Sequence, residues 1–233
     1  MNREQLKLTA IAAMTVNHTA IALVPPQSIL YTIMTDIGYL TAVTMCYFLV
    51  EGYYHTRSKM AYMQRLGVSA IISQVPYMLA LGFRQLNMLF TLFLCFLVLL
   101  VMDKVKQRVL KIPAVIGLFC CSFFCDWAFK AVLFTVFFAL TYRAKQSLVI
   151  PFSAAFFVQF CLSLYEYQQT YPDWQTLLLA LASSAGIIFA GYLIIRKYNG
   201  KRSDKHKTFW KWFFYLYYPL HLLLLYLFKM ILR

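Results

Sequence analysis

Long runs of apolar residues, separated by short stretches rich in Lys and Arg, repeat along nearly the whole chain. A helix needs about 20 apolar residues to cross the core of a bilayer. Measured against that length, the pattern predicts nine membrane-spanning helices, at 6–24, 29–50, 66–82, 88–102, 112–126, 127–142, 147–165, 175–195 and 209–229. The region 112–142 is expected to form either two short helices that turn at the segment CDWAFK or one long broken element.

Basic residues set the predicted orientation, because cytoplasmic loops of membrane proteins carry an excess of Lys and Arg. With the N-terminus in the cytoplasm, 18 of the 22 Lys and Arg residues fall on the inner side. Losing one span in 112–142 would scramble this distribution, which favours two helices there. The sequence therefore predicts an all-α, polytopic membrane helix bundle. Residues 1–233 would form a single transmembrane domain, with the N-terminus inside and the C-terminus outside.

Composition agrees with this class. The chain is 62% hydrophobic and only 13% charged, which excludes a disordered chain and is too apolar for an ordinary soluble domain. The net charge of +14 is spread between the apolar runs, so we expect membrane lipids as partners and no nucleic acid. The start resembles a signal peptide but lacks a small-x-small cleavage site, so it is interpreted as a retained first span.

Six cysteines lie in or at the edges of apolar runs, without the spacing of a metal finger. Cys120, Cys121 and Cys125 stand close to Asp126 and could be considered as metal ligands. Thiols in apolar surroundings more often act as small packing groups. We therefore predict no metal site.

Two histidines occupy equivalent depths in the predicted bundle. His18 and His221 each lie twelve residues into a span that runs from inside to outside, or roughly 18 Å at the rise of a helix. A histidine at that depth can exchange a proton near neutral pH and could act as a general base. The alternative is a neutral imidazole that ties helices together by hydrogen bonds. We expect both rings to line one shared cavity.

The neighbours of these histidines are polar or helix-breaking. Asn17 precedes His18 in an apolar run, where a polar pair costs insertion free energy. Pro219 removes a backbone donor close to His221. Tyr217 and Tyr218 share the face of His221, either as an aromatic packing stripe or as site residues. Tyr218 is the better site candidate because it adjoins the proline.

A charged cluster follows the second predicted span, with Glu51, His55, Arg57 and Arg65 in or near the segment FLVEGYYHTRS. Such a cluster usually serves topology or anionic lipid, but arginine also matches the geometry of phosphate. Glu51, at the edge of the core, is expected to pair with Arg57 or His55.

Four polar residues are predicted nearer the outer side. Asn87 and Thr91 share a helical face, Asp36 lies deeper in the second span, and Asp126 ends the fifth. For Asp126 the alternative is an acid in a helix turn at the membrane interface. For Asp36 we expect a position facing the same cavity as the histidines.

The motifs LKLTAIAAMTVNH, FLVEGYYHTRS, FTLFL, NGKR and KWFFYLYYPLHLLLLYL, in this order, resemble the TraX family of membrane proteins, named for a pilin N-acetylase. The resemblance covers nearly the whole chain. It implies kinship with transmembrane acyltransferases of the bacterial cytoplasmic (inner) membrane. These proteins resemble one another in moving an acyl group from cytoplasmic acyl-coenzyme A (acyl-CoA) to an acceptor across the membrane.

Residue by residue, the resemblance carries over to His18, to Glu51 and Gly52, and to Pro219 and His221. One departure is Asn17, since the family usually has Asp before the histidine. Asn can orient an imidazole but cannot stabilise its charge, so either another acid compensates, Asp36 or Asp126, or the base is weaker here.

Together these features predict an acyl-CoA-dependent acyltransferase, most simply an acetyltransferase. Acyl-CoA would dock on the basic inner face at Arg57, Arg65 and their neighbours. His18 would be the general base for an outer-side acceptor, which could be a glycan, a lipid or a protein N-terminus. His221, Tyr218 or Asn87 would donate hydrogen bonds to the oxyanion. The alternative function is a proton-coupled transporter or channel with midplane histidines.

Overall fold

The computed structural model describes residues 1–203 and 206–232 of the chain. Within this described part, helices make up 82% of the structure and no strand forms. An isolated backbone bridge joins Leu86 to Cys125. The predicted all-α class is therefore confirmed.

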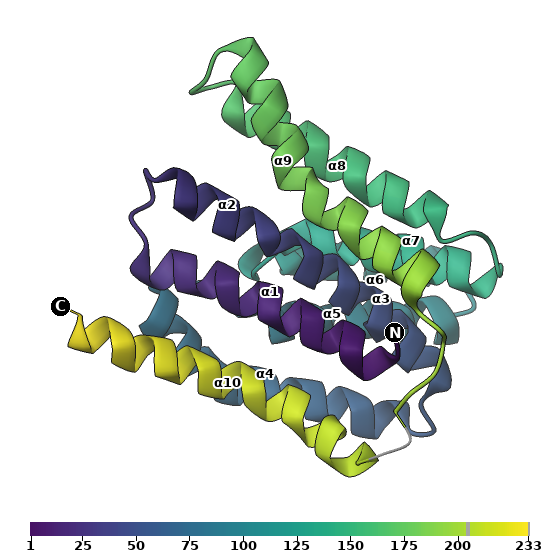
Figure 1. Cartoon of the computed structure of the whole chain (residues 1–233). Coiled ribbons are helices and arrows are strands. Elements are labelled where there is room, and N and C mark those ends of the chain that lie inside the picture. Colours follow the sequence, from purple (N-terminus) through teal and green to yellow (C-terminus); the bar gives the residue numbers. More distant parts are fainter. Residues whose placement is uncertain (204–205, 233) are drawn as a thin grey trace. The chain divides into compact units, whose positions relative to one another are not determined.

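Each predicted span corresponds to one or more helices (Figure 1). The α-helices of the described residues are α1 (Arg3–Leu23), α2 (Ile29–Ile37), α3 (Tyr39–His55), α4 (Lys59–Leu81), α5 (Met88–Lys104), α6 (Arg108–Cys121), α7 (Ala128–Arg143), α8 (Val149–Tyr167), α9 (Asp173–Tyr192) and α10 (Lys207–Ile231). A 3-10 turn (Ser122–Phe124) follows α6, and a π-helical turn (Leu193–Lys197) follows α9. The region 112–142 forms two helices, α6 and α7, as the charge distribution favoured.

Five segments among the described residues are long and apolar enough to cross a membrane. They are α1, the segment Ile29–His55, α8, α9 with its π-helical turn, and α10. Helices α5, α6 and α7 have 17, 14 and 16 residues, fewer than the roughly 20 that a perpendicular crossing needs. The count of nine spans and the orientation stay predictions.

The span predicted at 29–50 is interrupted at Gly38, where α2 ends and α3 begins. A Cβ atom on Gly38 would lie 2.5 Å from Nδ2 and 2.6 Å from Cγ of Asn17. Glycine is required there because it lets the Asn17 side chain approach the backbone of α2. The hydrophobic pattern could not show this close approach, since it depends on the packing of α1 against α2.

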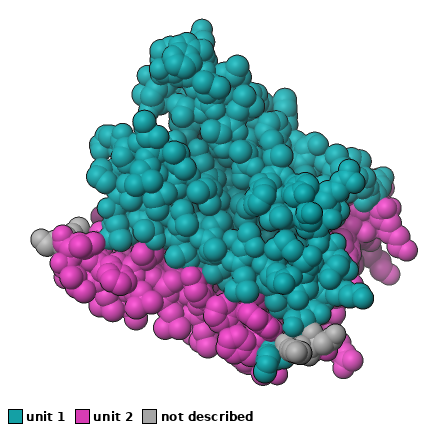
Figure 2. Space-filling view, in the orientation of Figure 1, with its two compact units in different colours: residues 1–45, 146–206 teal, residues 46–145, 207–233 magenta. Residues whose placement is uncertain are grey.

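Two compact units divide the chain, and each is described by itself (Figure 2). Unit 1 comprises 1–45 and 146–206, and unit 2 comprises 46–145 and 207–233. Each unit combines segments that are far apart in the sequence, and α3 contributes its first turns to unit 1 and the rest to unit 2. The prediction of a single domain over the whole chain stays a prediction.

Unit 1 consists of two helical hairpins that pack through α2 and α9. Helix α1 packs on α2, and α8 packs on α9. Gly186 of α9 lies against the junction of α2 and α3, where a Cβ atom would approach the backbone nitrogen of Leu40 to 2.9 Å. This close approach of two backbones keeps the junction buried against α9.

In unit 2, α5 is central and packs on α4, α6 and α7, while α10 packs along α4. Lys229, near the end of α10, donates a hydrogen bond of 3.0 Å to the backbone oxygen of Ala80 in the last turn of α4. The two helices therefore run parallel, with their C-terminal ends together. This arrangement sets the middle of α10 beside the second half of α4.

Candidate functional site

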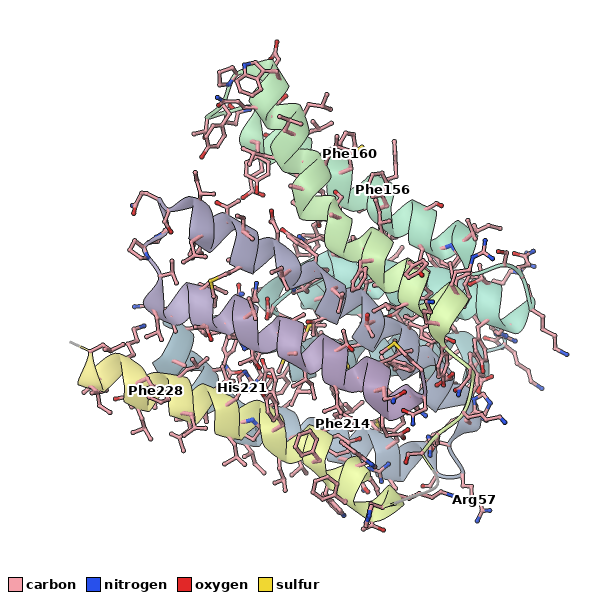
Figure 3. The ribbon with its side chains drawn as sticks, in the orientation of Figure 1. Arg57, Phe156, Phe160, Phe214, His221 and Phe228 are labelled. Carbon is pink, nitrogen blue, oxygen red and sulfur yellow. The ribbon has the colours of Figure 1, made fainter. Side chains whose placement is uncertain are left out.

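His221 lies near the middle of α10 and is 5% exposed (Figure 3). Its Nδ1 atom is 3.0 Å from the backbone oxygen of Tyr217. The Tyr217 ring stacks on the imidazole, with centroids 5.2 Å apart and planes 14° apart. The Tyr218 ring approaches the imidazole edge-on, with centroids 5.5 Å apart. Both tyrosines reach the histidine because positions three and four residues apart share a helix face.

Polar side chains gather around Tyr218, which is 4% exposed. Tyr77 of α4 and Asp126, which follows the 3-10 turn, lie close enough to Tyr218 to interact with it electrostatically. Gln85 donates a hydrogen bond of 3.3 Å to the Tyr77 hydroxyl. We call His221, Tyr218, Tyr77 and Asp126 the unit 2 polar cluster. The sequence predicted three of its members and missed Tyr77, which stands in an apolar run beside Pro76.

The backbone around Asp126 is held by the segment before α5. The Leu86 N–H donates to the Phe124 oxygen at 2.9 Å, and the Asp126 N–H donates to the Leu86 oxygen at 2.7 Å. The Thr91 hydroxyl donates a short hydrogen bond to the Asp126 backbone oxygen. Thr91 and Asp126, predicted in separate spans, are therefore brought together. Thr91 contacts the backbone at Asp126 and leaves the carboxylate to other partners.

Asn87 is completely buried and serves as the N-cap of α5. Its amide nitrogen donates to the Ala70 oxygen at 2.8 Å and to the Gln74 side-chain oxygen at 2.9 Å. Its side-chain oxygen accepts from the Leu89 N–H. Both amide hydrogens are thus used inside unit 2, and a hydrogen bond from Asn87 to substrate would require one of these bonds to break. The sequence missed Gln74, its partner on α4.

Asn17 and His18 lie on α1 in unit 1. The Asn17 amide nitrogen donates to the backbone oxygen of Thr35 at 2.9 Å, so its polar side chain satisfies a carbonyl in the last turn of α2. His18 is 6% exposed. Because His18 belongs to unit 1 and His221 to unit 2, their convergence on one cavity stays a prediction.

Unit 1 also contains a buried hydrogen-bond chain that the sequence did not indicate. The Gln159 amide donates to the Ser163 hydroxyl at 2.9 Å, and the Ser183 hydroxyl donates to Ser163 at 2.8 Å. Tyr39, in the first turn of α3, is hydrogen-bonded to Gln159. The spacing of Gln159 and Ser163, four residues apart in an apolar run, was the signal that could have revealed this chain.

Asp36 is half-buried near the end of α2. Glu166, in the last turn of α8, lies close enough to Asp36 for the two carboxylates to repel each other. The structure thus places the predicted site residue Asp36 beside Glu166, an acid that was not predicted as a site residue.

At the C-terminal end of α3, Glu51 is 8% exposed and His55 is exposed. The His55 Nδ1 atom is 2.9 Å from the Glu51 backbone oxygen and 3.2 Å from the Tyr142 hydroxyl. His55 therefore contacts the main chain of Glu51. The predicted pairing with the Glu51 carboxylate is not the hydrogen bond that His55 Nδ1 makes.

An ion pair that the sequence missed links α4 to α5. The Lys59 ammonium lies 2.8 Å from an Asp103 carboxylate oxygen, and the Tyr53 hydroxyl donates to the same oxygen at 3.0 Å. The ammonium also lies 4.1 Å from the centroid of the Tyr53 ring. The hydrogen bond from Lys59 holds the pKa of Asp103 below its usual range. An acid immediately after the apolar run 88–102 was the available signal.

Arg57 and Arg65 differ in exposure. Arg57 is exposed, whereas Arg65 is half-buried and its guanidinium carbon lies 5.7 Å from the centroid of the Tyr62 ring. The Arg65 Nε atom is buried and makes no hydrogen bond to any residue that the structure describes. A buried guanidinium nitrogen of this kind is suited to an anionic acceptor.

Metal ligands were not expected, and the described residues contain no group of three His, Cys, Asp or Glu side chains that could hold an ion. All six cysteines are free thiols. Cys125 is buried, whereas Cys120 and Cys121 are exposed.

A model of the family described as "TraX protein" matches residues 2–229. The chain belongs to the TraX family. A similar curated protein is the probable fimbrial assembly protein FimC of serogroup H1 from Dichelobacter nodosus. It is 32% identical to this TraX protein over 241 aligned positions, which cover 98% of the chain and 96% of the relative. No solved structure matches.

The TraX motifs divide between the two units. His18 lies in unit 1, whereas Glu51, Pro219 and His221 lie in unit 2. The motif NGKR pairs with the start of α1 inside unit 1, where the Arg3 N–H donates to the Lys201 oxygen at 3.0 Å. The start of α1, which carries the first motif, and the NGKR motif are therefore neighbours within unit 1, although they lie far apart in the sequence.

Proposed function

We propose that this TraX protein is a membrane-embedded acyltransferase that moves an acyl group, acetyl in the simplest case, from cytoplasmic acyl-CoA to an outer-side amine or hydroxyl. The observation that carries the proposal is the buried imidazole of His221 beside Tyr218, within the unit 2 polar cluster. Ionisable and polar groups inside membrane helices are costly and mark functional sites. A buried imidazole next to a hydroxyl is suited to proton transfer.

The proposed setting is the bacterial inner membrane, with nine spans and the N-terminus in the cytoplasm. On this topology the ends of α3 and α5 and the start of α4 face the cytoplasm. His221 lies deep in the membrane, and Asp36 and Glu166 lie toward the outer side. Acyl-CoA and acceptor would therefore approach from opposite leaflets.

The inner end would bind the phosphates of acyl-CoA. Arg65 contributes a buried Nε atom without an acceptor among the described residues, and exposed Arg57 adds a second cation. His55 and Glu51 form the adjoining end of α3. The ion pair of Lys59 with Asp103 fixes the start of α4 relative to α5, which keeps these groups in place for a planar, bidentate contact with phosphate.

The acceptor is proposed to be the N-terminal amine of a surface-fibre subunit. The relative's name describes fimbrial assembly, and the family takes its name from a pilin N-acetylase. The carboxylates of Asp36 and Glu166 would attract an ammonium group before transfer. Asn87 and Thr91 support the site through the backbone contacts described above.

The proton would be handled by the two buried histidines. One of the two imidazoles would take the proton of the attacking amine. Polar groups near the thioester, Tyr218 foremost, would stabilise the oxyanion by hydrogen bonding. Asn17 orients the α1 end of the site through its bond to Thr35.

Transfer can be tested in liposomes that contain the purified protein. Labelled acetyl-CoA is supplied on one side, with a synthetic peptide bearing a free N-terminal amine or the same peptide with that amine blocked. Label should enter only the free peptide, and His18→Ala should abolish this while the variant still inserts in the membrane. Full transfer by His18→Ala would remove His18 from the site.

Binding of coenzyme A separates this proposal from a proton-coupled transporter of unrelated solutes. A ligand at 100 times its Kd stabilises a protein by about 2.7 kcal/mol, so coenzyme A should raise the melting temperature, whereas pantetheine, which lacks the phosphates, should raise it less. Arg65→Gln should reduce the shift and the charge-matched Lys130→Gln should not. Equal shifts with both ligands, or no shift, would argue against the phosphate site.

A further inference from the structure

The aromatic residues of α10 form a ladder that ends on His221. Phe209, Phe213, Tyr217 and His221 follow one another at intervals of four residues, which share a helix face. Centroid distances along the ladder are 5.6, 5.6 and 5.2 Å, and the last pair is stacked. His221 is thus the last ring of a continuous row that begins in the first turn of α10.

The hydrogen bond of His221 determines which ring nitrogen carries the proton. A backbone carbonyl can only accept a hydrogen bond, so Nδ1, 3.0 Å from the Tyr217 oxygen, must be the N–H donor. In a neutral imidazole the other nitrogen, Nε2, then has a lone pair and no hydrogen. This tautomer accepts a proton at Nε2 and does not donate one there. The oxyanion-donor role expected for His221 therefore does not suit the neutral ring.

We propose that His221 is the proton acceptor of acyl transfer and that Tyr217 is its positioning residue. This inference rests on the proposed function. The Tyr217 ring, stacked at 5.2 Å and 14°, restricts rotation of the imidazole about its side-chain bonds. The Tyr217 carbonyl selects the tautomer. Tyr217 thus acts on both the plane of the ring and the direction in which Nε2 points, beside the edge-on contact of Tyr218.

The reaction step balances on this assignment. The amine nitrogen attacks the thioester carbonyl carbon, a carbon–nitrogen bond forms, and Nε2 takes a proton from the nitrogen. The carbon–sulfur bond then breaks, and coenzyme A leaves as a thiolate. The thiolate takes the proton back from Nε2, which restores the neutral imidazole. No oxidant, reductant or metal is consumed.

Two substitutions of His221 distinguish a proton acceptor from a hydrogen-bond donor. His221→Gln puts an amide N–H near the former Nε2 position, and His221→Asn keeps a donor near Nδ1. Neither side chain accepts a proton at neutral pH. Both variants should lose at least about 100-fold in transfer, the range of general-base catalysis. Transfer by His221→Gln within about tenfold of the natural protein would mean that His221 is a donor, and would overturn the proposal.

The tautomer can be read without any activity assay. The full-length protein, labelled with ¹⁵N-histidine in lipid, should give one imidazole signal with protonated Nδ1 and unprotonated Nε2 that is lost in His221→Gln. An Nε2–H tautomer at this site would also overturn the proposal. If the tautomer is as expected but the natural protein transfers no acyl group, the proposed function fails and the histidine geometry stands.

Whether the Tyr217 ring positions His221 is tested by comparing Tyr217→Leu with Tyr217→Phe. Tyr217→Leu removes the ring, keeps the carbonyl, and should mix the two tautomers in the spectrum and lower kcat about tenfold with little change in KM. Tyr217→Phe keeps the stack and should rescue both readouts. Phe228→Leu removes a 55% exposed ring from the same helix and is the matched control. A single Nδ1–H tautomer with natural kcat in Tyr217→Leu would show that the ring does not position His221.

Discussion

His221 and His55 make the same local hydrogen bond in different surroundings. Each imidazole approaches, through Nδ1, the backbone oxygen four residues earlier in its own helix, at 3.0 Å for His221 and 2.9 Å for His55. His221 is buried against two tyrosine rings, whereas His55 is exposed at the end of α3. The same helix carbonyl contact therefore occurs in both places, and the surrounding rings differ: His221 stacks on Tyr217, whereas His55 Nδ1 also lies 3.2 Å from the Tyr142 hydroxyl.

The residues around the two histidines also differ in burial. Around His221, polar groups bind backbone atoms, as Asn87 binds Ala70 and Thr91 binds Asp126. Near His55 the main contact is an ion pair, Lys59 with Asp103, with side chains 30% and 25% exposed. Buried polar groups need a fixed partner, while partly exposed charges are screened by water. The buried region around His221 should therefore be rigid and costly to change, and the partly exposed region around His55 should tolerate substitution.

The largest difference is expected between His221→Ala and His55→Ala. Loss of the buried ring should lower kcat for acetyl transfer by about 100- to 10,000-fold. Loss of the exposed ring should act mainly on KM for acetyl-CoA, by a few fold, because it adjoins the proposed phosphate site. Steady-state kinetics in liposomes measures both. Equal losses of kcat in the two variants would remove the distinction between the regions.

Asn87 tests the cost of losing a buried polar side chain. Asn87→Ala leaves the Gln74 side chain and the Ala70 carbonyl without their donor and removes the N-cap of α5, at about 1–3 kcal/mol. Asn87→Asp keeps the cap but sets a buried carboxylate oxygen against these two acceptors, so it should be at least as destabilising as Asn87→Ala. Unfolding in mixed micelles measures these differences. Asn199→Ala, in an exposed loop, is the control, and an Asn87→Ala variant as stable as that control would contradict the assignment.

Gly38 extends the comparison to Asn17 in unit 1. Gly38→Ala should destabilise by about 1–3 kcal/mol, the usual range for overpacking, because its Cβ atom meets the Asn17 side chain at 2.5 Å. Adding Asn17→Ala should relieve part of that loss. Gly186→Ala faces backbone atoms, so Asn17→Ala should not rescue it. Gly117→Ala, with open space around it, is the control. Thermal unfolding of the natural protein and of these single and double variants measures the differences.

The smallest effect is expected for Asp103→Asn, in the last turn of α5. A partly exposed ion pair contributes below about 1 kcal/mol. Because Lys59 lowers the pKa of folded Asp103, the contribution is present above the unfolded carboxyl pKa, near 4, and is lost as the pH falls through the lower folded value. Unfolding of the natural protein, of Asp103→Asn, of Lys59→Gln and of the double variant, at pH 7 and in acid, measures the pair. A coupling that persisted in acid would contradict the assignment.

The helical elements were predictable because apolar length and the placement of Lys and Arg are local properties of the chain. The spans at 6–24, 127–142 and 209–229 differ from the observed helices by only a few residues at either end. The close approach of Asn17 to Gly38 was not predictable, since it depends on a side chain from another helix. Tyr77 and Gln74 were missed because a single polar residue in an apolar run resembles an ordinary packing residue.

The sequence by itself determined the all-helical class, the TraX motifs and the presence of imidazoles deep inside apolar runs. Only the tertiary structure decided that Thr91 meets Asp126, that Lys59 pairs with Asp103, and that Tyr218 joins Tyr77. These pairings join residues that lie between 35 and 141 positions apart. Periodicity along one helix tells which face a residue occupies, whereas the partner on that face depends on how separate helices pack.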